Sequence, residues 1–351
     1  MTVTPDIGLS NVRLKWKVGS FWEKYGQAGE YDAGPYDTYL FGRTHQIGEA
    51  LAADMDVGDF TVKAGQGIGA KLEQVAAGQA PTAGQPGFTL LTHYHAGVAY
   101  KKIVDANLHY LASWAQDARA TPTSPDGKID VVGGEVRLTG GVAGVLYAGY
   151  SHVSATNAGA VGPAIEVIHS LGGGNHQTGN GLIDNYFGPC TKCVAADVGT
   201  GSVDTVEIAY NYSFGLLYRK LRDPRANFWG DGMDLTLGLF GMYTAVSSKD
   251  TADGFDGVKK LKYGADLVFR ALSWVGIGAR TDIVQPSSKD QSQSFWVVSP
   301  KIMFRTAFIT HEEITAQYSH YGYKSGVTPQ PPNNGFQPDE NVVGIKATMW
   351  W

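Results

Sequence analysis

The chain has 351 residues, among them 46 glycines, with 17% charged and 11% aromatic residues and a formal net charge of −5. Coiled coils and disordered acidic tails need far more charge than this, and dedicated nucleic-acid-binding proteins normally carry a basic excess, so these classes are excluded. No stretch approaches ~18 consecutive apolar residues, which excludes membrane-spanning helices. A water-soluble all-β protein and a membrane β-barrel remain, since in a barrel the inward and outward residues alternate.

Apolar and polar residues alternate with a period of two along the whole chain, which is the pattern of β-strands with one apolar face. In the first run, Asn11–Val18, the side chains of Val12, Leu14, Trp16 and Val18 share one face, and the other face is entirely polar. About fourteen strands are predicted in this way, at Asn11–Val18, Thr38–Met55, Phe60–Leu72, Phe88–Lys101, Val104–Asp117, Ile129–Thr139, Val142–Val153, Val206–Arg219, Met233–Ala245, Lys260–Ala271, Trp274–Val284, Phe295–Arg305, Glu313–Tyr323 and Val342–Trp351.

One predicted strand departs from the pattern. In Thr38–Met55, Glu49 lies on the same face as the apolar residues Ile47, Leu51 and Met55. A charged residue on an apolar face predicts a bulge or a different register at this point.

Strand length and the connections favour a membrane protein. Several predicted strands exceed the ~5–6 residues usual in soluble proteins and reach the ~9–11 residues that a tilted strand needs to cross a bilayer. Aromatic residues gather near the strand ends, as in interfacial girdles, and short turns alternate with long glycine- and proline-rich connections, except at Lys220–Gly232, where a short turn is expected. We therefore predict a transmembrane antiparallel up-and-down β-barrel of about 14 strands (14–16), a single domain over residues 1–351 with both termini periplasmic.

The end of the chain adds a resemblance. Trp351 lies on the same face as Val343 and Ile345, so it is expected to face lipid. In this the chain resembles the Gram-negative porin-like outer-membrane proteins, whose final strand ends in an outward aromatic residue, and Phe304–Tyr323 is loosely similar to a penultimate strand of large porins. The resemblance implies an outer membrane with lipopolysaccharide as the lipid environment and small hydrophilic solutes as the cargo.

The inward face of the predicted barrel is rich in bases. The basic candidates for the pore lining are Arg13, Lys15, Lys17, Lys63, Arg137, Arg219, Lys260, Lys262, Arg270, Arg280, Lys301, Arg305 and Lys346. The acids on the same face are Asp105, Asp117, Glu135, Glu207, Asp234, Asp266, Asp282 and Glu313. The excess of bases predicts a mild preference for small anions, with Arg13, Lys15 and Lys17 forming a ladder without an intervening acid. The alternative interpretation is that the charges pair across strands, for example Lys262 or Arg270 with Asp282, and neutralise one another.

Three histidines are further pore-lining candidates. With a three-residue turn at Lys101–Ile103, His95 lies opposite His109, and His93 is one step away on the same face. Paired imidazoles bind divalent metals or change their charge near pH 6, and the alternative is an ordinary polar lining. We predict neither a bound metal nor a cofactor.

The longest connection, Ser154–Ser202, is either a constriction loop folded inward or an external cap. It contains Cys190 and Cys193, for which a local disulfide is the prediction in an exported protein. Redox chemistry and metal binding are the alternatives for this pair of cysteines.

No catalytic constellation is found in the sequence. The chain has no GxSxG motif, no phosphate-binding loop and no metalloprotease helix, and the neighbours Ser151 and His152 point to opposite faces of a strand. We therefore predict no enzyme but a passive outer-membrane channel for small hydrophilic solutes, with a mild anion preference and no nucleic-acid partner. The alternative is a non-conducting or partner-filled barrel that serves as a scaffold or sheath in a secretion or electron-transfer complex. A homo-oligomer and a periplasmic or plug partner both remain open.

Overall fold

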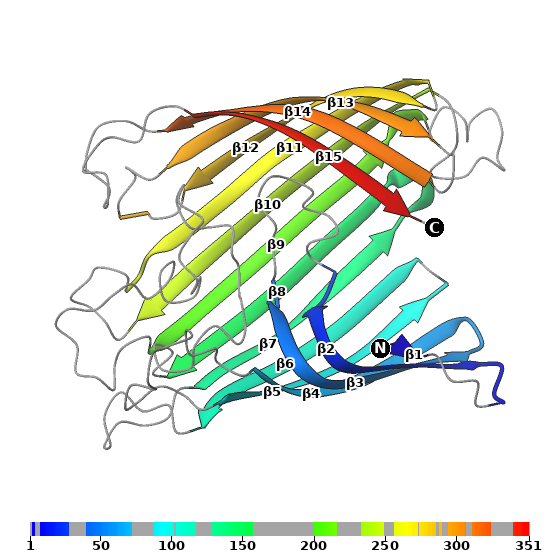
Figure 1. Ribbon diagram of the computed structural model, residues 1–351, viewed down its shortest axis with the longest axis vertical. Helices are drawn as coiled ribbons and strands as arrows, with labels where there is room; N and C mark the ends of the chain where they lie inside the picture. The colour runs from blue at the N-terminus through cyan, green and yellow to red at the C-terminus, as the bar shows by residue number, and fades with distance from the viewer. Residues whose placement is uncertain are drawn as a thin grey trace, which may run out of the picture. The chain divides into compact units, whose positions relative to one another are not determined.

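The computed structural model describes residues 2–3, 8–27, 40–71, 88–101, 103–116, 128–156, 200–215, 233–248, 256–272, 274–285, 288–289, 294–306, 311–323 and 340–350. The strands are β1 (Thr2–Val3), β2 (Val12–Lys24), β3 (Arg43–Val57), β4 (Phe60–Lys71), β5 (Phe88–Tyr100), β6 (Val104–Gln116), β7 (Lys128–Thr139), β8 (Val145–Thr156), β9 (Gly201–Ser213), β10 (Asp234–Ser248), β11 (Lys259–Leu272), β12 (Val275–Gln285), β13 (Phe295–Thr306), β14 (His311–Tyr323) and β15 (Glu340–Trp350). They form one sheet in which each strand pairs with its neighbours in the sequence (Figure 1). In the described ranges, no helix is long and apolar enough to cross a membrane.

The predicted all-β, antiparallel up-and-down architecture is confirmed, and this strand order is that of a β-barrel. Each predicted strand overlaps one of β2 to β15. The additional strand β1 is short and pairs with β2 at Thr2↔Lys17 and Val3↔Trp16, which brings the sheet to 15 strands. Some boundaries differ. The strand predicted at Thr38–Met55 is β3, which begins at Arg43 and ends at Val57.

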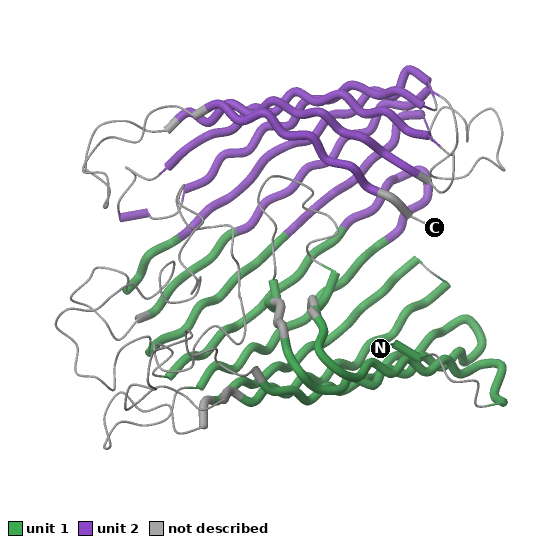
Figure 2. The backbone as a smooth tube through the Cα atoms, in the orientation of Figure 1, with its two compact units in different colours: residues 1–138, 147–207, 243–259 green, residues 139–146, 208–242, 260–351 purple. Residues whose placement is uncertain are grey.

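The chain divides into two compact units, which Figure 2 shows in different colours: residues 1–138, 147–207 and 243–259, and residues 139–146, 208–242 and 260–351. In the first unit, β2 to β7 pair antiparallel without a register shift, from Val12↔Met55 to Trp114↔Lys128.

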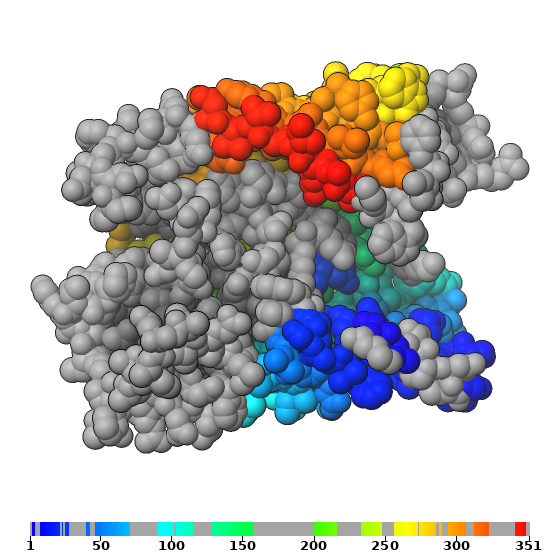
Figure 3. Space-filling view, in the orientation of Figure 1, coloured from blue at the N-terminus to red at the C-terminus, as the bar shows by residue number. Residues whose placement is uncertain are grey.

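In the second unit, β11 to β15 pair antiparallel, with one register shift between Arg270 and Leu272. The last strand, β15, is exposed over residues 341–348 and lies at the surface, in red, in the space-filling view (Figure 3). Its pairing partner within the described residues is β14.

The irregularity predicted at Glu49 is wrong. Strand β3 pairs with β2 and with β4 without a shift, and Glu49 lies opposite Val18 on one side and Ile68 on the other. Glu49 is exposed, like Ile47 and Leu51. The carboxylate therefore belongs to the apolar face of a regular strand.

The apolar face of the sheet is exposed and the polar face is buried. In the first unit, Trp16 and Tyr110 expose 41% and 39% of their surface, whereas Asp105 exposes 5%. In the second unit, Phe214 exposes 43% and Asp282 is fully buried. Soluble proteins place such residues the other way round. A β-sandwich with these aromatic residues in a dry interior is therefore excluded.

Several predictions fall outside the described residues. They concern Asp117, Arg219, Cys190, Cys193, Trp351, all of Lys220–Gly232 and residues 157–199 of the longest connection.

Candidate functional site

Strands β2 and β3 form a hairpin whose far end folds onto the polar face of the sheet. The two strands remain paired as far as Lys24↔Arg43, and their ends turn away from β4 in Figure 1. Residues 25–27 and 40–42, which adjoin these ends, contact side chains or glycines of β5 to β8. Because neighbouring strands lie ~4.8 Å apart, a segment that leaves β3 reaches β8 only by crossing the face of the sheet. We call residues 20–27 and 40–47 the inner hairpin.

Paired glycines allow this bend. Gly19 lies opposite Gly48, and Gly19 has a φ of 114°, a conformation that side-chain-bearing residues rarely adopt. A Cβ atom at position 48 would lie 2.5 Å from the Cα of Gly69 and closer still to the carbonyl oxygen of Ile68. Only glycine at position 48 therefore lets β3 approach β4 this closely.

The aromatic residues of the inner hairpin pack on histidines of the sheet. The ring of Tyr25 lies 4.4 Å from that of His93 on β5, and the ring of Phe41 lies 4.6 Å from that of His109 on β6. Tyr25 exposes 2% of its surface, and Leu40 and Phe41 expose none. These three side chains fasten the hairpin to the sheet by burial of apolar surface.

Two glycines of the sheet provide the space for the inner hairpin. A Cβ atom at Gly133 on β7 would lie 2.8 Å from Cε1 of Phe41. One at Gly149 on β8 would overlap with the side chain of Leu40. Glycine inside a strand is unfavourable except where another segment comes close, and here that segment is the inner hairpin.

The face that the inner hairpin covers is not uniformly polar. Six apolar residues near the strand ends that adjoin the long connections expose 3% or less of their surface: Leu91, Leu111, Ile129, Val131, Val153 and Ala155. The entirely polar face predicted for Asn11–Val18 is therefore not a feature of β5 to β8 at this end.

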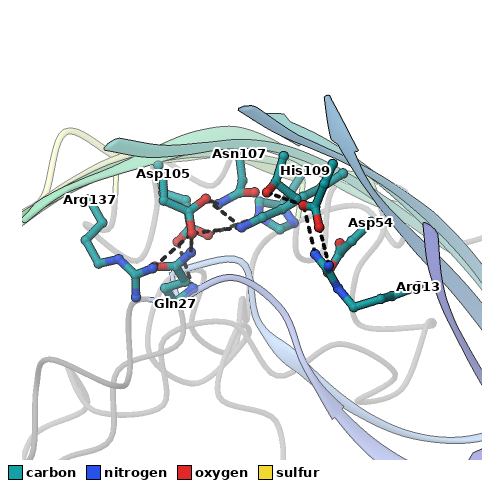
Figure 4. Close-up of polar contacts among 11 residues, drawn as sticks. Arg13, Gln27, Asp54, Asp105, Asn107, His109 and Arg137 are labelled. Carbon is teal, nitrogen blue, oxygen red and sulfur yellow. Dashed lines mark hydrogen bonds and ion pairs between the residues drawn. The ribbon is translucent and has the colours of Figure 1, made fainter. Parts of the chain in front are cut away.

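Asp105 lies at the centre of a polar cluster next to the inner hairpin (Figure 4). Lys63 Nζ donates to both carboxylate oxygens, at 2.7 and 2.8 Å, and Arg137 donates to one of them at 3.0 Å. The side-chain amides of Asn107 and Gln27 also donate to it, at 3.1 and 3.2 Å. One carboxylate thus faces two bases, and the cluster keeps a net positive charge.

The histidines form a hydrogen-bonded chain with a glutamate. The predicted cross-strand pair is confirmed, because His95 lies opposite His109. His93 Nε2 lies 3.4 Å from His109 Nδ1, and His109 Nε2 lies 3.3 Å from a carboxylate oxygen of Glu135. The hydroxyl of Tyr147 donates to the other oxygen of Glu135 at 3.0 Å. Within the described part of the chain, no group of three or more His, Cys, Asp or Glu residues has the geometry of a metal site.

Gln27 connects the inner hairpin to both polar groups. Its backbone N–H donates to Glu135 at 2.7 Å, and its side-chain amide donates to Asp105. These two charge-assisted hydrogen bonds act on the inner hairpin together with the burial of Tyr25 and Phe41. The inner hairpin is therefore held in one position.

The predicted ladder of bases on β2 has acidic partners. Arg13 donates to Asp56 of β3 at 2.5 Å and lies 4.0 Å from Asp54 (Figure 4). Lys17 forms an ion pair of 2.5 Å with Glu23 of its own strand. The sequence-based count of inward acids leaves these three carboxylates out. No acid lies between the three bases on β2, but two of them are paired, as the alternative interpretation expects.

The remaining basic candidates differ in burial. Three of them are ion-paired: Lys301 with Asp266 at 2.6 Å, Arg305 with Glu313 at 2.5 Å and Arg280 with Asp282 at 2.7 Å. Asp282 thus pairs with Arg280, whereas Lys262 and Arg270 were the partners expected from the sequence. Of the others in the described ranges, Lys15 and Lys346 are exposed, Arg270 is half-buried, and Lys260 and Lys262 are buried.

Sequence reasoning missed the inner hairpin itself. Tyr25 lies in a stretch that was predicted to be a loop, and Leu40 and Phe41 in one that was predicted to be a strand. The available signal was the set of glycines at inward positions, namely Gly48, Gly65, Gly67, Gly69, Gly97, Gly133 and Gly149. Such positions indicate the close approach of another segment.

Comparisons with known proteins give little. No protein-family model matches the chain, and no curated protein matches it. Among solved structures, the chain is similar to one described as the crystal structure of a Pseudomonas aeruginosa FadL homologue, with 10% identity and a TM-score of 0.31 over 96% of this chain and 85% of that one.

Proposed function

We propose that this chain is a Gram-negative outer-membrane β-barrel that passes small hydrophilic solutes through a narrow lumen, with the inner hairpin as its constriction. The observation that carries the proposal is the inverted burial of the sheet, with large apolar side chains exposed on one face and charged side chains buried on the other. Transmembrane barrels have this distribution, because lipid surrounds the outward face.

Tyrosines on the outward face support the membrane placement. Near the long connections, the hydroxyl of Tyr110 donates to Asp130 at 2.9 Å and that of Tyr150 donates to Asp204 at 2.6 Å. At the opposite ends of the strands, the hydroxyl of Tyr210 donates to the carbonyl oxygen of Ala143 at 2.6 Å. Amphipathic tyrosine rings gather at both membrane interfaces, where one end of the ring is apolar and the other is hydrated.

The paired charges of the inward face support a passive channel of weak selectivity. Arg13, Lys17, Lys63 and Arg137 all have carboxylate partners, and paired charges contribute little to the field in a lumen. The mild anion preference in the proposal rests on the excess positive charge around Asp105 and on the exposed Lys15.

The constriction in the proposal differs from the one expected from the sequence. The longest connection was a candidate for this role, but residues 157–199 lie outside the described part of the chain. The inner hairpin instead crosses the inward face with its aromatic residues buried. In the proposed orientation both termini are periplasmic and the long connections face the exterior.

The second candidate function is a non-conducting barrel that holds a partner or serves as a scaffold. Its support is the burial of the inward face, where Glu207, Lys262 and Asp282 expose 2% or less of their surface. A lumen in which such residues are buried leaves little room for solutes.

Planar-bilayer recordings separate the two candidates. Stepwise open-channel currents support the channel, whereas a silent protein with heat-modifiable gel migration, and hence a folded barrel, supports the scaffold. Selectivity follows from the reversal potential in a KCl gradient. Replacing Arg13, Lys15 and Lys17 together by Gln is expected to shift it toward cations, because three positive charges are removed and the carboxylate partners of Arg13 and Lys17 are left without a base. An unchanged reversal potential would show that these charges do not face the permeating ions.

A further inference from the structure

Glu49 is an ionisable residue on the outward apolar face of the sheet. Its neighbours on the same face of β3, Ile47 and Leu51, expose 53% and 44% of their surface. Glu49 is exposed as well, and its side chain makes no hydrogen bond or ion pair with any residue that the structure describes. An ionised carboxylate without a partner is costly against lipid, so a cationic group from outside the chain would stabilise ionised Glu49.

Other acids on the outward face differ from Glu49 in this respect. Asp130 accepts a hydrogen bond from Tyr110 at 2.9 Å and forms an ion pair of 2.8 Å with Lys128. Asp204 accepts from Tyr150 at 2.6 Å. These two carboxylates have hydrogen-bonding partners in their own chain, whereas the Glu49 carboxylate has none among the described residues.

A pocket of about 280 Å³ lies next to this carboxylate, lined by Trp16, Glu49, Leu51, Gln66, Gly67 and Ile68. Its walls come from two cross-strand rows, Trp16↔Leu51↔Gln66 and Val18↔Glu49↔Ile68. The next row contains the pair Ala53↔Ala64, whose small side chains leave the surface low at that point. The pocket is slightly smaller than the ~300–1,000 Å³ of drug-sized sites, so it fits a slender ligand.

The pocket combines the groups that recognise an alkylammonium ion. Glu49 supplies the negative charge, and the indole of Trp16 supplies a ring face that attracts cations. Leu51 and Ile68 provide apolar walls for a hydrocarbon chain, and the Gln66 amide adds a hydrogen-bonding group at the rim. A neutral amphiphile could donate a hydrogen bond to the carboxylate but would not neutralise its charge, and an anionic one would be repelled.

We propose that the pocket around Glu49 and Trp16 binds a single-chain alkylammonium amphiphile from the membrane, with the ammonium on Glu49 and the chain against Leu51 and Ile68. The proposal rests on the proposed membrane placement of the outward face. It does not depend on whether the barrel conducts.

Titration of the purified full-length protein in a non-ionic detergent with octylammonium, followed by isothermal titration calorimetry, tests the site. We expect saturable binding that is weakened about 10- to 150-fold by Glu49→Gln, since contacts to charged groups have this strength. Trp16→Leu is expected to weaken binding less. The matched control is Asp130→Asn on the same face, which should leave binding unchanged. Octyl sulfate should show no saturable binding.

Equal affinity of the wild type and Glu49→Gln, or no saturable octylammonium binding, would overturn the proposal. A wild type that dimerises in sedimentation while Glu49→Gln is monomeric would overturn it as well, because a second copy would then supply the cation. A silent bilayer recording with normal octylammonium binding would refute the channel and leave this site intact. A protein that is soluble without detergent would refute the membrane placement on which both depend.

Discussion

Replacement of Gly48 by alanine tests whether the inner hairpin constricts the lumen. The added Cβ would lie 2.5 Å from Gly69 Cα, and real Cβ atoms essentially never come within 3.0 Å of another heavy atom. Strand β3 must therefore move away from β4, and it does so most directly by straightening, which withdraws the inner hairpin from the inward face.

The expected size of the effect follows from the overlap. Inserting one extra methyl group into a closely packed place costs ~1–3 kcal/mol. A change of this size shifts the ratio of docked to withdrawn hairpin by about 5- to 150-fold. We expect the ratio of open to closed time in single-channel recordings to rise by the same factor, until the channel is open all the time.

Planar-bilayer recording of Gly48→Ala beside Gly67→Ala provides the assay. Gly67 is an inward glycine of β4, but a Cβ there would lie 3.4 Å from the Glu49 carbonyl oxygen, which is an ordinary contact. Gly67→Ala should therefore conduct like the wild type. Heat-modifiable migration of both variants shows that they fold. Unchanged occupancy in a folded Gly48→Ala variant, or an equal rise in both variants, would refute the role of the bend.

Two further predictions concern the contacts of the inner hairpin and the charges beneath it. Phe41→Ala removes a fully buried ring, weakens docking by ~3–5 kcal/mol and should raise the mean conductance in bilayers; a folded variant with unaltered conductance would contradict this. Asp105→Asn leaves Lys63 and Arg137 without their carboxylate. The reversal potential in a KCl gradient should therefore move toward the value expected for an anion-selective channel. The free energy of unfolding should fall by ~1–3 kcal/mol. An unchanged reversal potential would show that the two bases do not face the permeating ions.

The strands were predictable because a period of two is a local signal. Each strand carries its own apolar face, so Val12, Leu14 and Trp16 define β2 without knowledge of its neighbours. The pairing of His95 with His109 was also predictable, because a short turn fixes the register of the two strands that it joins.

The inner hairpin was not predictable from the same pattern. The alternation of apolar and polar residues predicts which face of a strand a residue occupies, but it does not predict which distant segment packs on that face. Phe41 meets His109 and Gly133 only because β3 bends at Gly48, and this bend depends on space between strands rather than on hydrophobicity. The partners of Arg13 were missed because the strand that carries Asp54 and Asp56 had an irregular pattern at Glu49.

The way in which the inner hairpin is connected to the sheet limits how it can be changed by mutation. Residues 20–24 and 43–47 continue the same two strands that pair with β1 and β4 nearer the turns. The inner hairpin is thus formed by the ends of two strands of the sheet and not by a separate inserted segment. A deletion that removes it also shortens β2 and β3, whereas point substitutions at Gly19 or Gly48 change its position and leave both strands at full length.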